Sequence, residues 1–238
     1  MRIFIGTDSR GFNVEEKYYV RKKKGERKTV LHKKYPFERS WISLLTESVN
    51  KQHEVVLSAT LDDFRRRKRR LVSITSLSED INFQPYDLAI IQVGLHECLS
   101  WNKTVWNLFV NGINKHDLIK SGQKDGLYKL RDLSILKKQL ENALSTVTRC
   151  LFIGMHSWRF KKQMWKPNMY HYRILEMQNL IGSVDKVDMM NMPMDISWVR
   201  HNSSDGIHYN CDTHAFIYGY TKRYIERYGK SVRYFIEQ

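Results

Sequence analysis

Short apolar runs alternate along the chain with segments whose apolar residues recur at helical spacing. Each run is four to eight residues long and ends in Gly, Ser or a polar turn residue, as buried strands do. The five runs are residues 2–5, 53–58, 86–93 and 150–155 and a short run within 184–192. The run YDLAIIQV (86–93) is almost continuously apolar, which is typical of a parallel strand covered by helices on both faces.

The segments between these runs favour helices. Apolar residues fall three or four positions apart in residues 40–49, 101–113, 133–147, 170–181 and 213–228, and a basic helix is expected from the end of the second strand through Arg70. Alternating strands and helices predict a three-layer α/β/α sandwich with a mainly parallel, flavodoxin-like five-stranded sheet. We expect one domain over residues 1–238, with a basic polar insertion at about 14–38, of which 14–34 is expected as a loop.

Positive charge is the unusual feature of the composition. The formal net charge is +15, and residues 1–70 hold 19 Lys or Arg against 9 Asp or Glu. Two runs dominate, RKKKGERK (21–28) and RRRKRR (65–70). Such runs indicate a polyanionic partner (nucleic acid, an anionic glycan or a phosphorylated carrier), or they are solvated surfaces without a partner. Nucleic acid is possible but not favoured, because no helix-turn-helix, zinc finger or RNP-like aromatic pattern accompanies the charge.

The sequence lacks the patterns that are typical of disulfide-rich, zinc-binding and membrane-spanning proteins. Cys98, Cys150 and Cys211 are far apart and lack zinc-like pairing, so we expect neither a disulfide framework nor a metal site. No apolar stretch approaches the ~18 residues of a membrane span, and the first run is too short for a signal peptide. We therefore expect a cytoplasmic protein without a cofactor. The oligomeric state stays open.

Polar residues gather where the predicted strands end, and strand ends are where ligands bind in such sheets. GTDSRG (6–11) follows the first strand, VGLHE (93–97) follows the third, and DGIHYN (205–210) precedes the last helix. A serine needs a base to become a nucleophile, histidine suits that task, and a carboxylate orients the histidine. Ser9, His208 and Asp205 offer these three groups. Gly, Asp and Ser are also ordinary turn formers.

In this order the blocks resemble the SGNH/GDSL hydrolases, and the resemblance covers nearly the whole chain. It implies Ser9 as nucleophile, His208 as base and Asp205 as its orienting partner, with the Ser9 N–H as an oxyanion donor. His96 stands where the family usually has Asn. Residues expected near the oxyanion or the substrate are His96, Gly94, Asp8, Arg10, Glu97 and Asn210.

The chain departs from the family pattern at several positions. Thr7 stands in place of Gly before Asp-Ser, Glu97 replaces Asp in the third block, and Asp62 falls near the second block, which lacks its usual glycine. An imidazole N–H can still donate to an oxyanion. His96 and Glu97 could instead be structural, with His96 bonding a loop carbonyl and Glu97 in an ion pair. His156 and Trp158 could line the same cleft.

The expected function is that of a serine esterase acting on an O-acyl ester, in the first place an acetyl ester, of a carbohydrate or carrier-linked substrate. The basic composition favours an anionic substrate. An O-acyltransferase using the same acyl-enzyme is the alternative. Two readings of another class stay open, a non-catalytic SGNH-like binding domain and a nucleic-acid-binding protein.

Overall fold

The fold is known from a computed structural model. It describes residues 1–12, 14–20, 29–34, 36–58, 72–100, 118–121, 126–156, 158–161, 164–167, 171–203 and 208–236. The basic helix expected through Arg70, the helix expected at 101–113 and the position of Asp62 lie outside these residues.

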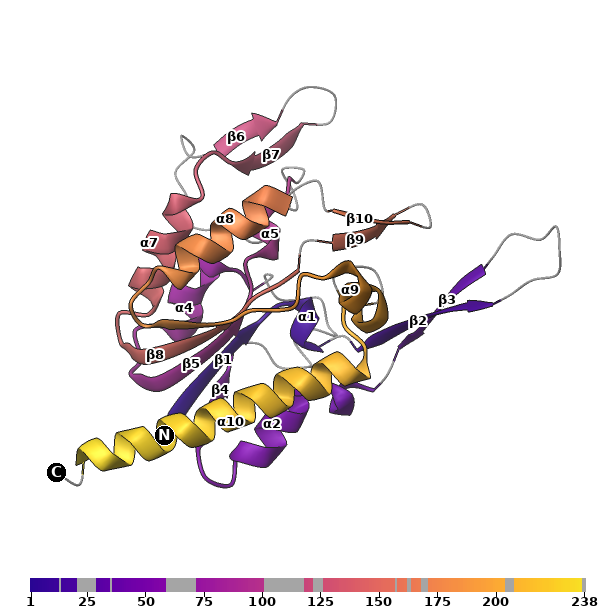
Figure 1. Ribbon diagram of the computed structural model, residues 1–238. Helices are drawn as coiled ribbons and strands as arrows, with labels where there is room; N and C mark the ends of the chain where they lie inside the picture. The colour runs from indigo at the N-terminus through magenta and orange to yellow at the C-terminus, as the bar shows by residue number, and fades with distance from the viewer. Residues whose placement is uncertain are drawn as a thin grey trace.

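A five-stranded parallel sheet forms the centre, with strand order β11-β8-β5-β1-β4 (Figure 1). Its strands are β1 (Arg2–Thr7), β4 (Glu54–Leu57), β5 (Tyr86–Gln92), β8 (Val147–Ile153) and β11 (Val187–Met190). Every strand overlaps one of the apolar runs, although β1 continues to Thr7 and β8 already begins at Val147. The predicted parallel sheet is therefore confirmed, because continuous apolar runs have a buried place only in a sheet that is covered on both faces.

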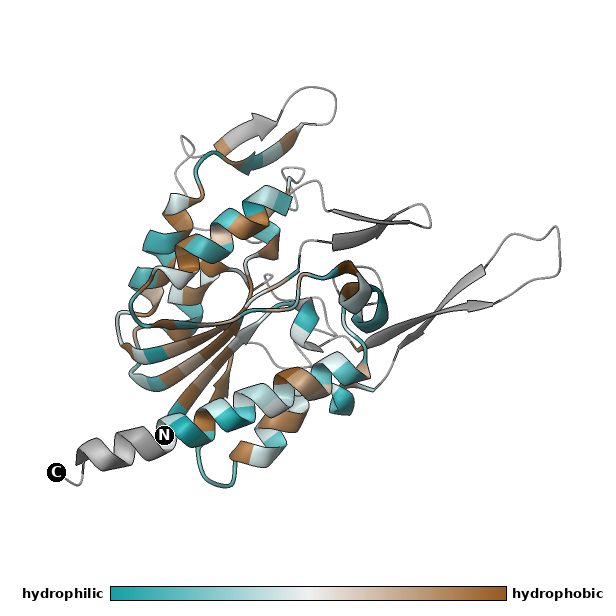
Figure 2. Cartoon of the chain, viewed as in Figure 1, coloured by the Kyte–Doolittle hydropathy of each residue, from teal (hydrophilic) through white to brown (hydrophobic). Residues whose placement is uncertain are grey.

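Helices cover both faces of this sheet and complete the predicted three layers (Figure 1). On one face α10 (Cys211–Ile236) packs against α2 (Trp41–Val49). On the other, α7 (Ser134–Ala143) packs against α4 (Leu77–Ile81) and α8 (His171–Gly182). Apolar colour concentrates on the strands in Figure 2, and the helices alternate between apolar and polar residues. Helix α2, for example, buries Trp41, Ile42, Leu45 and Val49.

Antiparallel hairpins extend the chain beyond the sheet (Figure 1). They pair β2 (Glu15–Val20) with β3 (Thr29–Lys34), β6 (Leu118–Ser121) with β7 (Leu127–Leu130), and β9 (Trp158–Lys161) with β10 (Met164–Pro167). The prediction of a loop at 14–34 is therefore wrong for most of this segment. Tyr18 pairs with Leu31 and Tyr19 with Val30, and aromatic and β-branched residues favour strands even in a basic segment without clear periodicity.

The remaining regular elements are short. They are α1 (Ser9–Phe12), η1 (Phe37–Arg39), η2 (Ile74–Ser76), α5 (Leu95–Cys98) and α9 (Ile196–Asn202). Of these, α1 and α5 directly follow β1 and β5, at the carboxyl edge of the sheet. In the described part of the chain, no helix is long and apolar enough to cross a membrane.

Candidate active site

The first block forms a tight turn between a strand and a short helix. Strand β1 ends at Thr7 and α1 begins at Ser9. The backbone N–H of Asp8 donates to the carbonyl of Gln92 on β5 (3.2 Å), and the N–H of Gly11 donates to the carbonyl of Asp8 (3.2 Å). A Cβ at Gly11 would lie 2.3 Å from Thr7 Oγ1, so the close approach requires glycine there. Ser9 is therefore held at the carboxyl edge, at the start of a helical turn.

Asp8 and Arg10, on either side of Ser9, form a buried ion pair. Arg10 Nε lies 2.9 and 3.1 Å from the two carboxylate oxygens of Asp8, and Nη2 lies 2.7 Å from Oδ2. The Arg10 N–H also donates to Oδ1 (3.0 Å). Burial acts to raise the pKa of Asp8, but the charge and hydrogen bonds of Arg10 outweigh it and hold that pKa below its ordinary value. The pair fixes the backbone that carries Ser9.

The second block supplies His96 from the turn after β5. Gly94, which precedes α5, has φ +104°, a conformation that favours glycine. His96 is half-buried. Burial lowers its pKa, and the charge of Arg10 acts in the same direction while that of Asp8 opposes it. Burial and the charge of Arg10 thus favour the neutral form of the imidazole.

Glu97, the next residue, is fully buried, and its carboxylate binds the backbone of another element. Its Oε1 accepts from the N–H of Ile74 in η2 (2.5 Å). Burial raises the pKa of Glu97 to about 7, against the lowering effect of backbone hydrogen bonds from Glu97, Ile74 and Thr75. Glu97 thus connects the turn that carries His96 to η2, which directly precedes α4.

The last block is held by hydrogen bonds at Ser203 and at residues 208–210, the parts of it that the structure describes. Ser203 Oγ donates to the carbonyl of His208 (2.7 Å), and the N–H of Asn210 donates to the carbonyl of Asn202 (3.1 Å). Ser203 also forms an antiparallel bridge with Tyr209. His208 is half-buried. Its backbone is therefore fixed by the segment at the end of α9.

Tyr209 brings this block against the first one. It forms a parallel bridge with Val14, just beyond α1, and is buried. Burial raises the pKa of Tyr209 to about 12, and the charges of Arg10 and Asp8 both act on it. The residue next to His208 thus lies beside the residues that flank Ser9.

Asn210 has a clear role at the start of α10. Its Oδ1 accepts from the backbone N–H of Thr213 (3.0 Å) and from Thr213 Oγ1 (3.1 Å), and its Nδ2 donates to the carbonyl of His201 (3.0 Å). This is the bonding of a helix N-cap. A contact with substrate stays a prediction for Asn210, as it does for Gly94, Asp8, Arg10 and Glu97.

The structure adds polar contacts of Gln92 and His214 that the sequence analysis missed, and it buries His156, which was expected near the cleft. Trp41 Nε1 donates to Gln92 Oε1 (3.0 Å), and the Trp41 N–H donates to His214 Nδ1 (3.1 Å). The ring of His156 meets that of Tyr209 edge to face, with centroids 5.8 Å apart. The role of Gln92 could have been inferred from the sequence, because it is a lone amide at the end of a largely apolar strand.

The triad itself stays a prediction, because Asp205 lies outside the described residues. Trp158, which was also expected near the cleft, lies at the start of β9. Among the described residues no three His, Cys, Asp or Glu are grouped as metal ligands.

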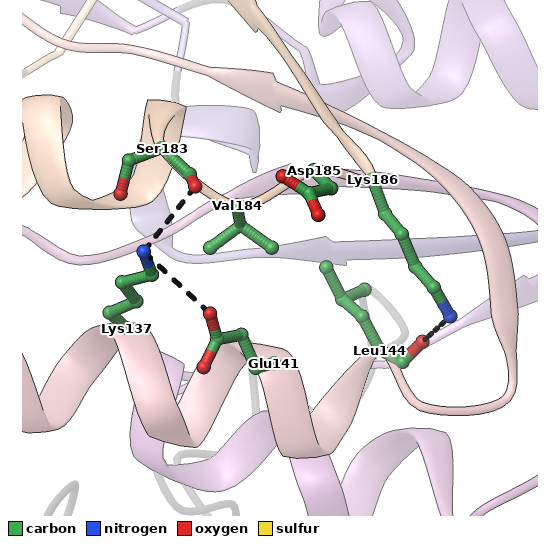
Figure 3. A pocket seen from close by; sticks show the side chains of 7 residues that line it. All are labelled: Lys137, Glu141, Leu144, Ser183, Val184, Asp185 and Lys186. Atoms are coloured by element: carbon green, nitrogen blue, oxygen red, sulfur yellow. Dashed lines mark hydrogen bonds and ion pairs between the residues drawn. The ribbon is translucent and has the colours of Figure 1, made fainter.

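A pocket of about 260 Å³ lies at the opposite edge of the sheet, where β8 and β11 begin (Figure 3). Its lysines already have partners. Lys186 Nζ donates to the carbonyls of Leu144, Ser145 and Val147 (3.0–3.3 Å), and Lys137 Nζ lies 3.4 Å from the Ser183 carbonyl and 3.8 Å from Glu141. The pocket is therefore separate from the candidate active site.

No protein-family model and no curated protein matches the chain. Solved structures resemble it weakly. One is an alpha/beta hydrolase enzyme from the metagenome of Lake Arreo in Spain, 10% identical, with a TM-score of 0.46 over 96% of this chain and 94% of that one. Another is a catalytic mutant of an acetylxylan esterase from Geobacillus stearothermophilus, 11% identical, with a TM-score of 0.45 over 96% and 93%. Likeness at this level carries no argument about activity.

Proposed function

We propose that the protein is a serine ester hydrolase of the SGNH type, with Ser9 as nucleophile, His208 as general base and Asp205 as the partner that orients His208. The substrate is an O-acyl ester, in the first place an acetyl ester, of a carbohydrate or a carrier-linked saccharide.

The observation that carries this proposal is the bridge between Val14 and Tyr209. It joins two segments almost 200 residues apart in the chain, one directly after the block of Ser9 and the other directly after His208. The charges of Asp8 and Arg10 act on both Tyr209 and His96. These contacts support the proposal, because they connect segments at or next to three blocks that the sequence analysis selected separately.

In the proposed reaction Ser9 Oγ attacks the ester carbonyl and His208 takes its proton. The negative charge on the tetrahedral oxygen is stabilised by the Ser9 N–H and the His96 ring N–H. A neutral His96 suits this role, because one ring nitrogen carries a hydrogen and donates it. His208 then protonates the departing alcohol oxygen, and water activated by the same residue releases the acid from the acyl-enzyme.

Covalent labelling tests the proposal most directly. The chain is incubated with a fluorophosphonate probe, and the labelled peptide is mapped by mass spectrometry while hydrolysis of p-nitrophenyl acetate is followed. We expect the label on Ser9 and loss of both label and turnover in Ser9→Ala. Ser183→Ala, an exposed serine near the opposite edge of the sheet, serves as the matched control and should keep both. A label on another serine, or unchanged turnover in Ser9→Ala, would contradict the proposal.

A further inference from the structure

Hairpins leave the sheet at the carboxyl ends of three neighbouring strands. β1, β5 and β8 are adjacent in the sheet. Along the chain β1 is followed by β2 and β3, β5 by β6 and β7, and β8 by β9 and β10, each pair before the next long helix. In Figure 1 all three hairpins extend on the side of the domain where α1 and α5 lie. The three hairpins therefore surround the edge that holds the candidate active site.

The same three segments carry most of the net charge. Residues 15–34, 118–130 and 158–167 together contain 16 Lys or Arg and 4 Asp or Glu, whereas the rest of the chain contains 24 and 21. They thus account for +12 of the +15. If the charge were spread evenly over a solvated surface, it would not be concentrated in the three segments that follow neighbouring strands. Positive charge gathered around one site attracts anionic ligands to it.

The size of the hairpins indicates an extended ligand. The strands of the first hairpin have six residues each, which at ~3.4 Å a residue gives an arm of about 20 Å. Neighbouring strands of the sheet lie ~4.8 Å apart, so the carboxyl ends of β1, β5 and β8 span about 10 Å. Such arms reach well beyond a single sugar unit. A chain of several units is needed to contact more than one of them.

We infer that the three hairpins form a basic binding surface for an acidic polysaccharide, whose O-acyl groups are the substrate of the site. This inference rests on the proposed function. An esterase needs a ligand that bears esters, and the hydroxyls of a uronate-bearing or phosphate-bearing glycan carry them, whereas DNA has no free hydroxyls along its chain. DNA is therefore disfavoured as the ligand of these hairpins, and RNA, which has a free 2′-hydroxyl on each nucleotide, is tested with poly(U).

Binding is measured with the full-length Ser9→Ala chain, so that no ester is consumed. The probes are polygalacturonate, neutral dextran and single-stranded poly(U), each at two salt concentrations.

Two variants each remove three positive charges from one hairpin. One variant changes Arg159, Lys161 and Lys166 of the β9–β10 hairpin to Gln, and a second changes Lys17, Lys33 and Lys34 of the β2–β3 hairpin to Gln. The control changes Lys51, Lys138 and Arg223 to Gln, which removes the same charge from exposed positions outside the hairpins.

We expect polygalacturonate to bind with strong salt dependence and dextran not to bind. Each hairpin variant should weaken binding by about tenfold at low salt, and the control by less than about twofold. Equal losses in the control and the hairpin variants would overturn the inference, because the charge would then act without regard to position. Tighter binding of poly(U) than of polygalacturonate at equal charge concentration would overturn it in favour of nucleic acid.

Turnover separates this inference from the proposed function. In the chain with Ser9, hairpin variants should hydrolyse p-nitrophenyl acetate at the unaltered rate and lose about tenfold in kcat/KM on O-acetylated polygalacturonate. Turnover of the small ester without any preference for the acidic polymer over O-acetylated xylan overturns the inference and leaves the esterase standing. Absence of turnover on every ester overturns the proposed function, and the substrate assignment falls with it.

Discussion

Arg10 holds the carboxylate of Asp8 through three side-chain hydrogen bonds, and each of the two side chains exposes only 1% of its surface. The two residues flank Ser9 in the turn that follows β1. A charge this deeply buried is tolerated only with its partner in place, because burial alone strongly disfavours it.

Replacing Arg10 by Met should therefore lower the free energy of unfolding by about 3–5 kcal/mol at pH 7, since it leaves a buried carboxylate without a counter-charge. The double variant Asp8→Asn, Arg10→Met should recover much of this loss. Urea unfolding followed by tryptophan fluorescence measures both. Equal midpoints for the wild type and Arg10→Met would show that the pair does not stabilise the turn.

The pH dependence of Arg10→Met offers a second check with a defined sign. In the wild type Arg10 holds the pKa of Asp8 below its ordinary value, so the stability that Asp8 contributes is present above about pH 4 and is lost as pH falls through the lowered pKa. Without Arg10, burial raises the pKa of Asp8. The variant should then gain stability on going from pH 7 to pH 4, relative to the wild type.

The sheet could be predicted from the sequence because its strands are nearly continuous apolar runs, as residues 86–93 show. The hairpins could not, because the sequence of a basic segment such as 15–34 shows no alternation of apolar and polar residues with a period of two. The roles of Ser9 and His208 follow from block order alone and stay predictions. The Asp8–Arg10 pair and the contacts of Gln92 depend on side chains meeting across the fold, and no local pattern reports such contacts.

Gly94→Ala should destabilise the turn that carries His96. Its φ of +104° is unfavourable for alanine, and an added Cβ would lie 3.1 Å from both Ile74 Cδ1 and Met177 Sδ. We expect a loss of about 2–3 kcal/mol, from backbone strain and crowding together. Gly126→Ala is the matched control, because Gly126 has φ +57° but nothing within 4 Å of an added Cβ. Its loss should be about 1 kcal/mol. Similar losses in the two variants would exclude crowding at Gly94.

Glu97 should make the protein less stable as pH rises. Burial raises its pKa from 4.5 to about 7, so the folded state binds the proton more tightly than the unfolded state does. The resulting stability is complete below about pH 4.5 and is lost as pH rises through 7, by up to about 3 kcal/mol. Glu97→Gln, which resembles the protonated form, should flatten the dependence between pH 5 and 8. Denaturant titrations at each pH measure it.

Glu226→Gln on α10 is the control for this prediction, because Glu226 is exposed. Its pH profile should follow that of the wild type. A wild-type profile that rises between pH 5 and 7, or a Glu97→Gln profile as steep as that of the wild type, would show that Glu97 is ionised in the folded state throughout this range.

The resemblance to the SGNH hydrolases implies that His96 takes the place of an Asn whose side chain donates to the oxyanion. If its N–H points to the same place as the Ser9 N–H, His96→Ala should lower kcat on p-nitrophenyl acetate by about 10²–10³ while KM changes little. Labelling of Ser9 by a fluorophosphonate should continue at a reduced rate, since the nucleophile and its base are intact.

His96→Asn distinguishes a donor from a structural residue. An amide N–H donates in a similar direction, so part of the lost turnover should return, although the shorter side chain limits the recovery. Because the pKa of His96 is lowered by burial, the donor is neutral in the working range, and its replacement by Asn should not shift the pH profile of kcat. Full turnover in His96→Ala, on an ester that Ser9→Ala cannot process, would make His96 structural and leave the oxyanion to backbone donors of the turn after β1.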